Sequence, residues 1–351
     1  MADISCEVFD EDDQIYLPNI PQNRIITVQN VTKKYSEVPF SGVDNASFAI
    51  DKGKIVAIVG ESGSGKSTLL KLIYGLMTPE KGHVFFRSEL IKGPEKKLIP
   101  GHEAMKMVTQ DFSLNTYAKV YDNIASMLPN TNLKYKVEKT ESMLQLLRIS
   151  HLAQKRVADL SGGEQQRVAI AKAIVTEPEV LLMDEPFSQV DTMLKSQLRA
   201  DLRRLSHELG ITILIVSHDP VDGLSLADEL VVIRRGAVLE TGSPAELYNR
   251  PRHLYTAKLL SDCNVLEKDA AEKIGVQVKK TVVGIRLEDV QLIENFSSGK
   301  MRVVDRFFKG YGEEVLLERS GVLIRALNLE VEKFQVGDLL DIGVKKVLSF
   351  D

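Results

Sequence analysis

One short segment carries the clearest chemistry in the chain. Residues 60–68, GESGSGKST, fit the phosphate-binding pattern G-x-x-x-x-G-K-[ST]. The apolar run KIVAIV at 54–59 predicts a buried strand before the segment, and TLLKLIY at 68–74 predicts the first turns of a helix after it. A strand, a glycine loop and a helix N-terminus together form a phosphate cradle, so the segment predicts binding of a nucleoside triphosphate.

The residue types within this loop have separate roles. We expect Gly60, Gly63 and Gly65 to adopt positive φ, which would turn backbone N–H groups toward phosphate oxygens. Lys66 would reach the β- and γ-phosphates. The hydroxyl of Ser67 would bind Mg²⁺.

A pair of acids follows a second apolar run, VLLMDE at 180–185. In a protein with a phosphate loop, an acid at the carboxyl end of the neighbouring strand completes the Mg²⁺ site, and Asp184 has that position. Glu185 would face the γ-phosphate and polarise a water for in-line attack as a general base.

A second anion-binding helix start is predicted about twenty residues before the acids, in LSGGE at 160–164. Ser161 has the side chain of an N-cap, and Gly162 and Gly163 expose backbone N–H groups. One chain cannot obviously aim both loops at one phosphate. Two copies packed head to tail can, because each would then cover the nucleotide of the other.

Composition limits the class of protein. At 351 residues the chain has room for two domains, and its net charge of −4 counts against nucleic acid as a partner. Cys6 and Cys263 are far apart, which predicts neither a disulfide framework nor a zinc cluster and suits a reducing cytoplasm. The longest apolar runs, such as 211–216, have strand length, and residues 1–6 do not have the pattern of a signal peptide.

The hydrophobic pattern divides the chain into four parts. An acidic extension at 1–23 precedes an α/β domain at 24–250, whose residues 112–175 are rich in helix formers; a linker at 251–265 leads to a small β-barrel at 266–351. In the α/β domain, strands alternating with helices predict a central, mostly parallel sheet. Besides the run before the phosphate loop, the predicted strands of this domain are 25–28, 46–50, 82–86, 104–108, 180–183, 211–216 and 229–233, and a helix is predicted at 192–209. The predicted strands of the β-barrel are 281–285, 301–304, 314–317, 321–324 and 344–350.

The phosphate loop, the serine-glycine-glycine segment and the paired acids resemble, in order and spacing, the ATP-binding subunits of ABC transporters. The resemblance covers roughly residues 24–250. It implies a phosphate-loop ABC ATPase domain with a helical subdomain, which hydrolyses ATP with Mg²⁺. It also implies a homodimer or a pair with a paralogous ATPase, integral membrane transporter subunits as partners, an extracytoplasmic binding protein acting indirectly, and a cytoplasmic location on the inner face of the membrane.

The resemblance assigns further roles. Tyr35 matches the aromatic residue that stacks on adenine, Gln110 the glutamine that touches Mg²⁺ and the attacking water, and His218 the histidine that senses the γ-phosphate. Residues 188–191, ending in Asp191, match the dimer-contact loop. Glu164 stands where many members have Gln, a change found in related subfamilies. The residues expected to contact nucleotide are Tyr35, Gly60, Ser62, Gly63, Gly65, Lys66, Ser67 and Thr68 and, on the signature and dimer loops, Ser161, Gly162, Gly163 and Asp191.

The C-terminal part resembles the OB-like regulatory (TOBE) domain of importers for sugars, iron, sulfate and polyamines. GIRLED at 284–289 is close to the hallmark of that domain, although Leu287 replaces a proline. QVGD at 335–338 and VLSF at 347–350 resemble its closing strands. A regulatory ligand site and a structural dimerisation module both remain open for this domain.

Two other functions fit parts of the sequence. Glu164 would permit the ATPase of an exporter or a lipoprotein-release system, but the C-terminal β-domain favours an importer. A soluble ABC-type ATPase of DNA repair or translation would call for zinc-binding cysteine pairs, two nucleotide domains in one chain or a basic surface. The sequence has none of these features.

Overall fold

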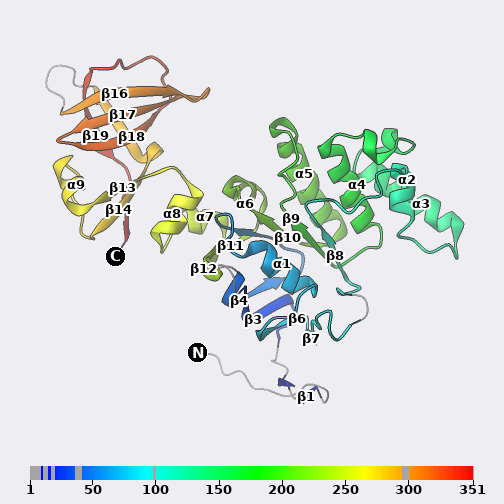
Figure 1. Cartoon of the computed structure of the whole chain (residues 1–351). Helices are drawn as coiled ribbons and strands as arrows, with labels where there is room; N and C mark the ends of the chain where they lie inside the picture. The colour runs from blue at the N-terminus through cyan, green and yellow to red at the C-terminus, as the bar shows by residue number, and fades with distance from the viewer. Residues whose placement is uncertain are drawn as a thin grey trace. The chain divides into compact units, whose positions relative to one another are not determined.

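The computed structural model describes residues 9–10, 15–16, 20–35, 42–97, 100–294 and 300–350 (Figure 1). The chain divides into two compact units, Met1–Pro244 and Ala245–Asp351. Most of the predicted acidic extension lies outside the described residues. Within it the structure describes one antiparallel pair, β1 (Phe9–Asp10) and β2 (Ile15–Tyr16).

A six-stranded sheet forms the centre of the first unit, in the order β12-β11-β5-β10-β9-β8. All neighbours are parallel except β12, which returns antiparallel to β11. Every residue of β5 and β10 is buried, because helices and a second sheet cover both faces of this sheet. The strands are β5 (Ile55–Val59), β8 (Met105–Val108), β9 (Val180–Asp184), β10 (Thr212–Ser217), β11 (Glu229–Arg234) and β12 (Ala237–Gly242).

The second sheet of this unit is antiparallel, in the order β4-β3-β6-β7. Its apolar side chains share a core cluster with α1 (Lys66–Tyr74) and with residues of β5, β9, β10 and β11. Helix α1 is therefore held between the two sheets, and its N-terminus stays at the carboxyl end of β5. The strands are β3 (Arg24–Lys34), β4 (Gly42–Asp51), β6 (Lys81–Phe86) and β7 (Glu89–Leu90).

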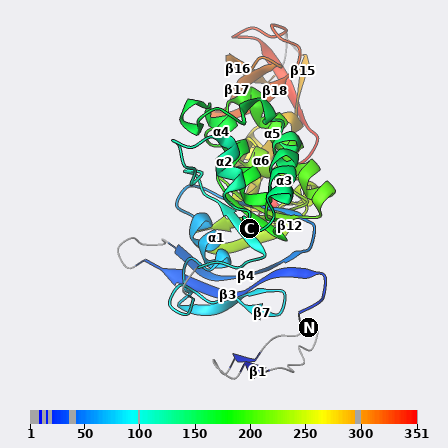
Figure 2. The same cartoon turned by 90° about the vertical axis from the view of Figure 1, so that its right-hand side faces the viewer.

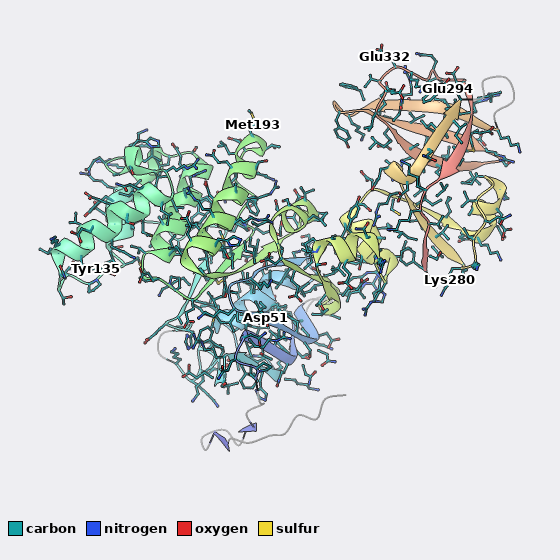
Figure 3. All side chains as sticks on the ribbon, turned by 180° about the vertical axis from the view of Figure 1, so that it is seen from behind. Asp51, Tyr135, Met193, Lys280, Glu294 and Glu332 are labelled. Carbon is teal, nitrogen blue, oxygen red and sulfur yellow. The ribbon has the colours of Figure 1, made fainter. Side chains whose placement is uncertain are left out.

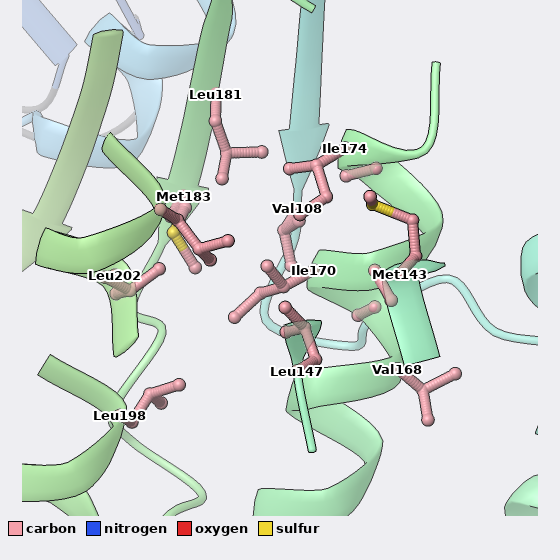
Figure 4. Packing of buried hydrophobic residues seen from close by; sticks show 14 of the residues in the cluster. Val108, Met143, Leu147, Val168, Ile170, Ile174, Leu181, Met183, Leu198 and Leu202 are labelled. Carbon is pink, nitrogen blue, oxygen red and sulfur yellow. The ribbon is translucent and has the colours of Figure 1, made fainter. Parts of the chain in front are cut away.

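Helices gather on the other side of the parallel sheet, away from the antiparallel sheet (Figure 2). They share a second core cluster with β8, β9 and β10, in which Ile170, Met183 and Leu202 are fully buried (Figure 4). This cluster fixes the helical part, predicted at 112–175, to the strand that carries the acid pair. The helices are α2 (Val120–Ala125), α3 (Leu133–Leu146), α4 (Gly162–Ile174), α5 (Thr192–Leu209) and α6 (Pro220–Leu226).

The second unit is built mainly from two antiparallel sheets, with the orders β13-β14-β20 and β15-β19-β16-β17-β18. This arrangement agrees with the predicted small all-β, OB-like fold. A helix that the sequence did not predict, α9 (Lys268–Lys273), follows the first strand. The strands are β13 (Cys263–Glu267), β14 (Val282–Arg286), β15 (Val290–Glu294), β16 (Met301–Phe308), β17 (Glu313–Arg319), β18 (Val322–Asn328), β19 (Leu339–Val344) and β20 (Leu348–Phe350).

The segment at 251–265, for which we predict a linker, differs from that expectation. It contains α8 (Leu254–Leu260) and the start of β13, and it lies within the second unit, after α7 (Pro244–Asn249). Ala257 packs against Leu348 and Phe350 near the end of the chain. Because these partners lie about ninety residues away, local composition does not reveal the contact.

A buried arginine anchors α7 and α8 within the second unit. Arg286 is 2% exposed and donates from Nε to Ser261 Oγ at 2.9 Å and from Nη2 to the carbonyl of Tyr248. Its guanidinium also lies 3.9 Å from the ring centre of Tyr248, as in a cation–π contact. The arginine of the predicted hallmark therefore has a structural role.

Candidate active site

The phosphate loop connects the buried strand β5 to α1, as its sequence predicts. Gly65 is the N-cap of α1 with φ of 99°, and Gly63 has φ of 76°. Both values lie in the left-handed region, where a residue with a side chain is strained. The backbone conformation expected at these two positions is therefore present.

The expectation for Gly60 was wrong, because its φ is not positive. A Cβ at this position would lie 2.3 Å from the carbonyl oxygen of Ile233 and 2.8 Å from Ser64 Oγ. Close approach of another backbone, rather than an unusual φ, requires glycine here.

Lys66 lies at the start of α1 with its side chain folded over the loop. It is 5% exposed, and its Nζ donates to the carbonyl oxygens of Gly60 and Glu61, both at 2.9 Å. Burial lowers the pKa of Lys66, and the nearby carboxylates of Glu185, Asp184 and Glu61 partly oppose this shift. The ammonium group is thus held inside the loop where phosphate oxygens would bind.

Ser67 and Asp184 bring two oxygen atoms together beside this ammonium group. Ser67 Oγ donates to Asp184 Oδ1 at 2.9 Å. Neighbouring ligands of an octahedral Mg²⁺ at ~2.1 Å are separated by about 3.0 Å, so this pair, 2.9 Å apart, fits the ion. Among the described residues no group of three or more His, Cys, Asp or Glu side chains could hold a metal. Mg²⁺ is commonly bound by one or two protein oxygens together with substrate phosphates.

Glu185 follows the end of β9 in a left-handed conformation, with φ of 51°. Its backbone N–H donates to the carbonyl of Val216 on β10, which fixes the turn. His218 Nδ1 lies 2.7 Å from Glu185 Oε2, so the imidazole orients the carboxylate. The carboxylate has the residue type and the orienting partner that a general base needs.

These groups line one cavity of about 450 Å³, within the ordinary range for a ligand site. Ten of the sequence-predicted residues meet there, and Asp184 joins them through Ser67. Sequence reasoning missed Gly42, which no local pattern marks, and it placed Ser188 only on the dimer loop. The lining residues are Tyr35, Gly42, Ser62, Gly63, Gly65, Lys66, Ser67, Thr68, Gln110, Glu185, Ser188 and His218.

The predicted signature residues do not line this cavity. Ser161 is the N-cap of α4, and with Gly163 it lines a separate cavity of about 330 Å³. Asp191 is the N-cap of α5, and Met193 beside it is 92% exposed (Figure 3). Ser161, Gly163 and Asp191 thus do not line the cavity that contains the phosphate loop, and their role on nucleotide stays a prediction.

Glu164 closes a capping box at the start of α4. Its carboxylate accepts from the backbone N–H of Ser161 at 2.8 Å and from the Ser161 hydroxyl at 2.9 Å. The backbone hydrogen bond is the main reason that the pKa of Glu164 is lowered. Glu164, which stands where many members of the family have Gln, therefore stabilises the start of α4 and leaves the signature backbone intact.

One residue that the sequence did not single out links three loops. Gln189 Nε2 donates to the carbonyl of Gln110 at 3.0 Å. A Cβ on Gly162 would lie 2.6 Å from the carbonyl oxygen of Gln189. The loop that carries Asp191 is thus packed against both the signature and the segment of Gln110.

The fold and this cavity define a phosphate-loop ATPase, and comparison with known proteins names the family. Residues 43–188 match the family described as ABC transporter. The chain is similar to the glucose import ATP-binding protein GlcV of Saccharolobus solfataricus, with 34% identity over 282 residues, 76% of this chain and 79% of the relative. It is also similar to the spermidine/putrescine import ATP-binding protein PotA of Spiroplasma citri, with 32% identity over 348 residues, 92% and 95% of the two chains.

A solved structure agrees with these relatives. CbiO1 from Clostridium perfringens, part of the ABC transporter complex cbiONQ, is similar with a TM-score of 0.58 and 30% identity, over 65% of this chain and 91% of that chain. The chain belongs to the ATP-binding proteins of ABC transporters, which confirms the predicted family, and it is an ATP hydrolase. No helix among the described residues is long and apolar enough to cross a membrane.

Proposed function

We propose that the chain is the ATP-hydrolysing subunit of an ABC importer and that two copies close around ATP. The observation that carries the proposal is that the phosphate loop and the Glu185–His218 pair line one cavity, and that Ser67 of this loop is hydrogen-bonded to Asp184. Each of these parts has a distinct task in phosphoryl transfer.

The tasks follow from the chemistry of each side chain. Lys66 neutralises charge on the β- and γ-phosphates, and exposed Tyr35 stacks on adenine. Ser67, Asp184 and Gln110 hold Mg²⁺, which when bound neutralises the charge that develops on phosphate oxygens. Glu185 takes a proton from the attacking water, while His218 orients Glu185 and contacts the γ-phosphate.

A second copy completes the site. The hydroxyl of Ser161 and the backbone of Gly163 contact the γ-phosphate bound by the other copy, so ATP joins the copies and hydrolysis releases them. The separation of these residues from the nucleotide cavity of their own chain supports this arrangement. A paralogous ATPase with the same surface could replace one copy.

Import is the direction of transport that the relatives favour over export. GlcV and PotA are named as import ATP-binding proteins, and PotA is matched over 95% of its length, including the all-β unit. The chain would then act at the cytoplasmic face of the membrane through separate transmembrane subunits. A binding protein outside the membrane would act on it only indirectly.

Nucleotide binding and hydrolysis by the purified chain test this proposal. Lys66→Ala should abolish Mg-ATP hydrolysis, whereas Lys71→Ala, an exposed lysine on the same helix, should leave it intact. Hydrolysis that survives Lys66→Ala would overturn the assignment of the site. For transport, the Glu185→Gln protein should recover integral membrane subunits from solubilised native membranes when Mg-ATP is present. Recovery of ribosomes or DNA instead would overturn the transport role.

A further inference from the structure

The turn between β11 and β12 packs against the phosphate loop but does not line the nucleotide cavity. Arg234 pairs with Ala237 across the hairpin, which leaves a two-residue turn of Arg235 and Gly236. Their φ values are 51° and 83°, so both residues are left-handed, as in a type I′ turn. The turn lies next to the loop because β11 pairs with β5 up to the register of Val232 and Val59.

The backbone N–H and the backbone carbonyl of Gly236 each form a hydrogen bond. Its N–H donates to the carbonyl of Ser64, in the middle of the phosphate loop, at 3.0 Å. Its own carbonyl accepts from the N–H of Asp44, at the start of β4, at 2.9 Å. Ser64 is 2% exposed, so water does not replace the first of these bonds readily.

The surrounding backbones approach too closely for side chains. A Cβ on Gly65 would lie 2.1 Å from the carbonyl oxygen of Gly42 and 3.5 Å from the Cα of Gly236. The close contact between Gly60 and Ile233, described above, is at the other end of the loop. The phosphate loop is therefore supported from behind by the backbone of β4 and of the β11–β12 hairpin.

We propose that Gly236 is a positioning residue for the phosphate loop and thereby sets the affinity of the chain for nucleotide phosphates. The inference rests on the proposed nucleotide site. A phosphate cradle acts through backbone N–H groups whose directions must be fixed before the ligand arrives. The hydrogen bond from the Gly236 N–H holds the carbonyl of Ser64, and with it the peptide unit between Ser64 and Gly65, while the bond from Asp44 anchors the turn to β4.

Gly236→Ala tests this role. The new Cβ would lie 3.0 Å from the carbonyl oxygen of Gly42 and 3.2 Å from the N–H nitrogen of Asp44. Both contacts are tight, so the turn and its neighbours must shift by a few tenths of an ångström, and the hydrogen bond to Ser64 passes this shift to the loop. A shift of this size is smaller than the ~1 Å misplacement that can cost ~100-fold, so we expect the Kd for Mg-ATP and for Mg-ADP to rise between about threefold and tenfold.

Gly53→Ala is the matched control. Gly53 has a similar φ of 74°, lies in the turn between β4 and β5, and has open space where the Cβ would be. Both variants bear the same kind of backbone strain, so both should lower the melting temperature. Only the variant at Gly236 should weaken nucleotide binding at temperatures where both proteins are folded.

Steady-state kinetics separate positioning from general damage. The loop grips phosphates in the ground state and in the transition state alike, so Gly236→Ala should raise KM with kcat changed by less than about threefold. Equal Kd values for the Gly236→Ala and Gly53→Ala proteins would overturn the inference. If Gly236→Ala does not fold, Gly236→Asn serves in its place, because Asn tolerates the left-handed conformation. Failure of the unaltered chain to bind nucleotide would instead overturn the proposed function.

Discussion

The hydrogen bond between Glu185 and His218 should make these two residues act as one catalytic unit. The exposed fractions of the two side chains are 17% for Glu185 and 60% for His218, so the histidine is the more exposed partner. Its Nδ1 lies 2.7 Å from the carboxylate, close enough to fix the direction in which the second oxygen faces. Changing either residue alone should therefore remove much of the same effect.

The expected magnitudes follow from these roles. Glu185→Gln keeps an acceptor for His218 but removes the general base, whose contribution is typically ~10²- to 10⁴-fold in kcat. His218→Ala leaves the base in place but unoriented, with an expected loss of about 100-fold. If the two losses were independent, the double variant would lose the product of the two factors. We expect the double variant to be no more than about tenfold slower than Glu185→Gln alone.

Single-turnover hydrolysis of Mg-ATP measures these rates without interference from product release. Retained ADP affinity in each variant serves as the control, because both residues are assigned to the γ-phosphate position and neither belongs to the phosphate loop. Losses that multiply in the double variant would refute the reasoning. Glu185→Gln with near-normal hydrolysis would also refute it, because another group would then be the base.

Three other side chains give outcomes that single substitutions can check. Ser67→Ala should raise the Mg²⁺ concentration needed for half-maximal hydrolysis at least ~10-fold, because Asp184 loses its partner oxygen; an unchanged Mg²⁺ titration would contradict the assigned site. Arg286→Ala should destabilise the second unit by about 3 kcal/mol in urea unfolding, since it leaves buried acceptors without a donor; a loss below ~1 kcal/mol would contradict the anchoring role. Burial and the hydrogen bond to Glu288 raise the pKa of Tyr248 from 10.0 to about 12. The stability that the neutral phenol contributes is thus complete below pH 10 and lost as the pH rises through about 12. Tyr248→Phe should reduce this alkaline loss of stability, which urea midpoints measured at steps of ~1 pH unit from pH 9 to 12 would detect. Identical midpoints for both proteins across this range would show that Tyr248 contributes nothing to the stability.

The sequence predicts those parts of the site that are continuous along the chain. The strand, the loop and the helix around Lys66 form as their pattern indicates, because the apolar runs and the glycines determine local structure. Asp184 and Glu185 were predictable because a fully apolar run places them at the end of a central strand. Ser67 and Asp184 were both predicted at one Mg²⁺ site, and the structure joins them by a hydrogen bond, whereas the contact between Glu185 and His218 was not predicted.

The sequence does not reveal contacts between backbone segments that lie far apart along the chain. Gly60 and Gly236 need to be glycine because Ile233 and Gly42 approach them, and no local pattern reports an approach of that kind. Helix α8 in the predicted linker depends in the same way on the last strand of the chain. Strand registers bring these segments together, and registers are set by the whole sheet rather than by any one strand.

The most direct test of the account is whether Ser161 holds a nucleotide bound by another copy. Two proteins are loaded with Mg-ATP: Glu185→Gln, and the double variant that also has Ser161→Asp. The rate of ATP release from each protein is then measured after a chase with unlabelled nucleotide. Aspartate keeps an N-cap oxygen for α4 but loses the hydroxyl that donates to Glu164, and it adds negative charge toward the phosphate. We predict that ATP leaves the double variant at least ~10-fold faster, whereas ADP leaves both proteins at equal rates. Because Ser161 does not line the nucleotide cavity of its own chain, equal ATP release from the two proteins would contradict a site completed by two copies.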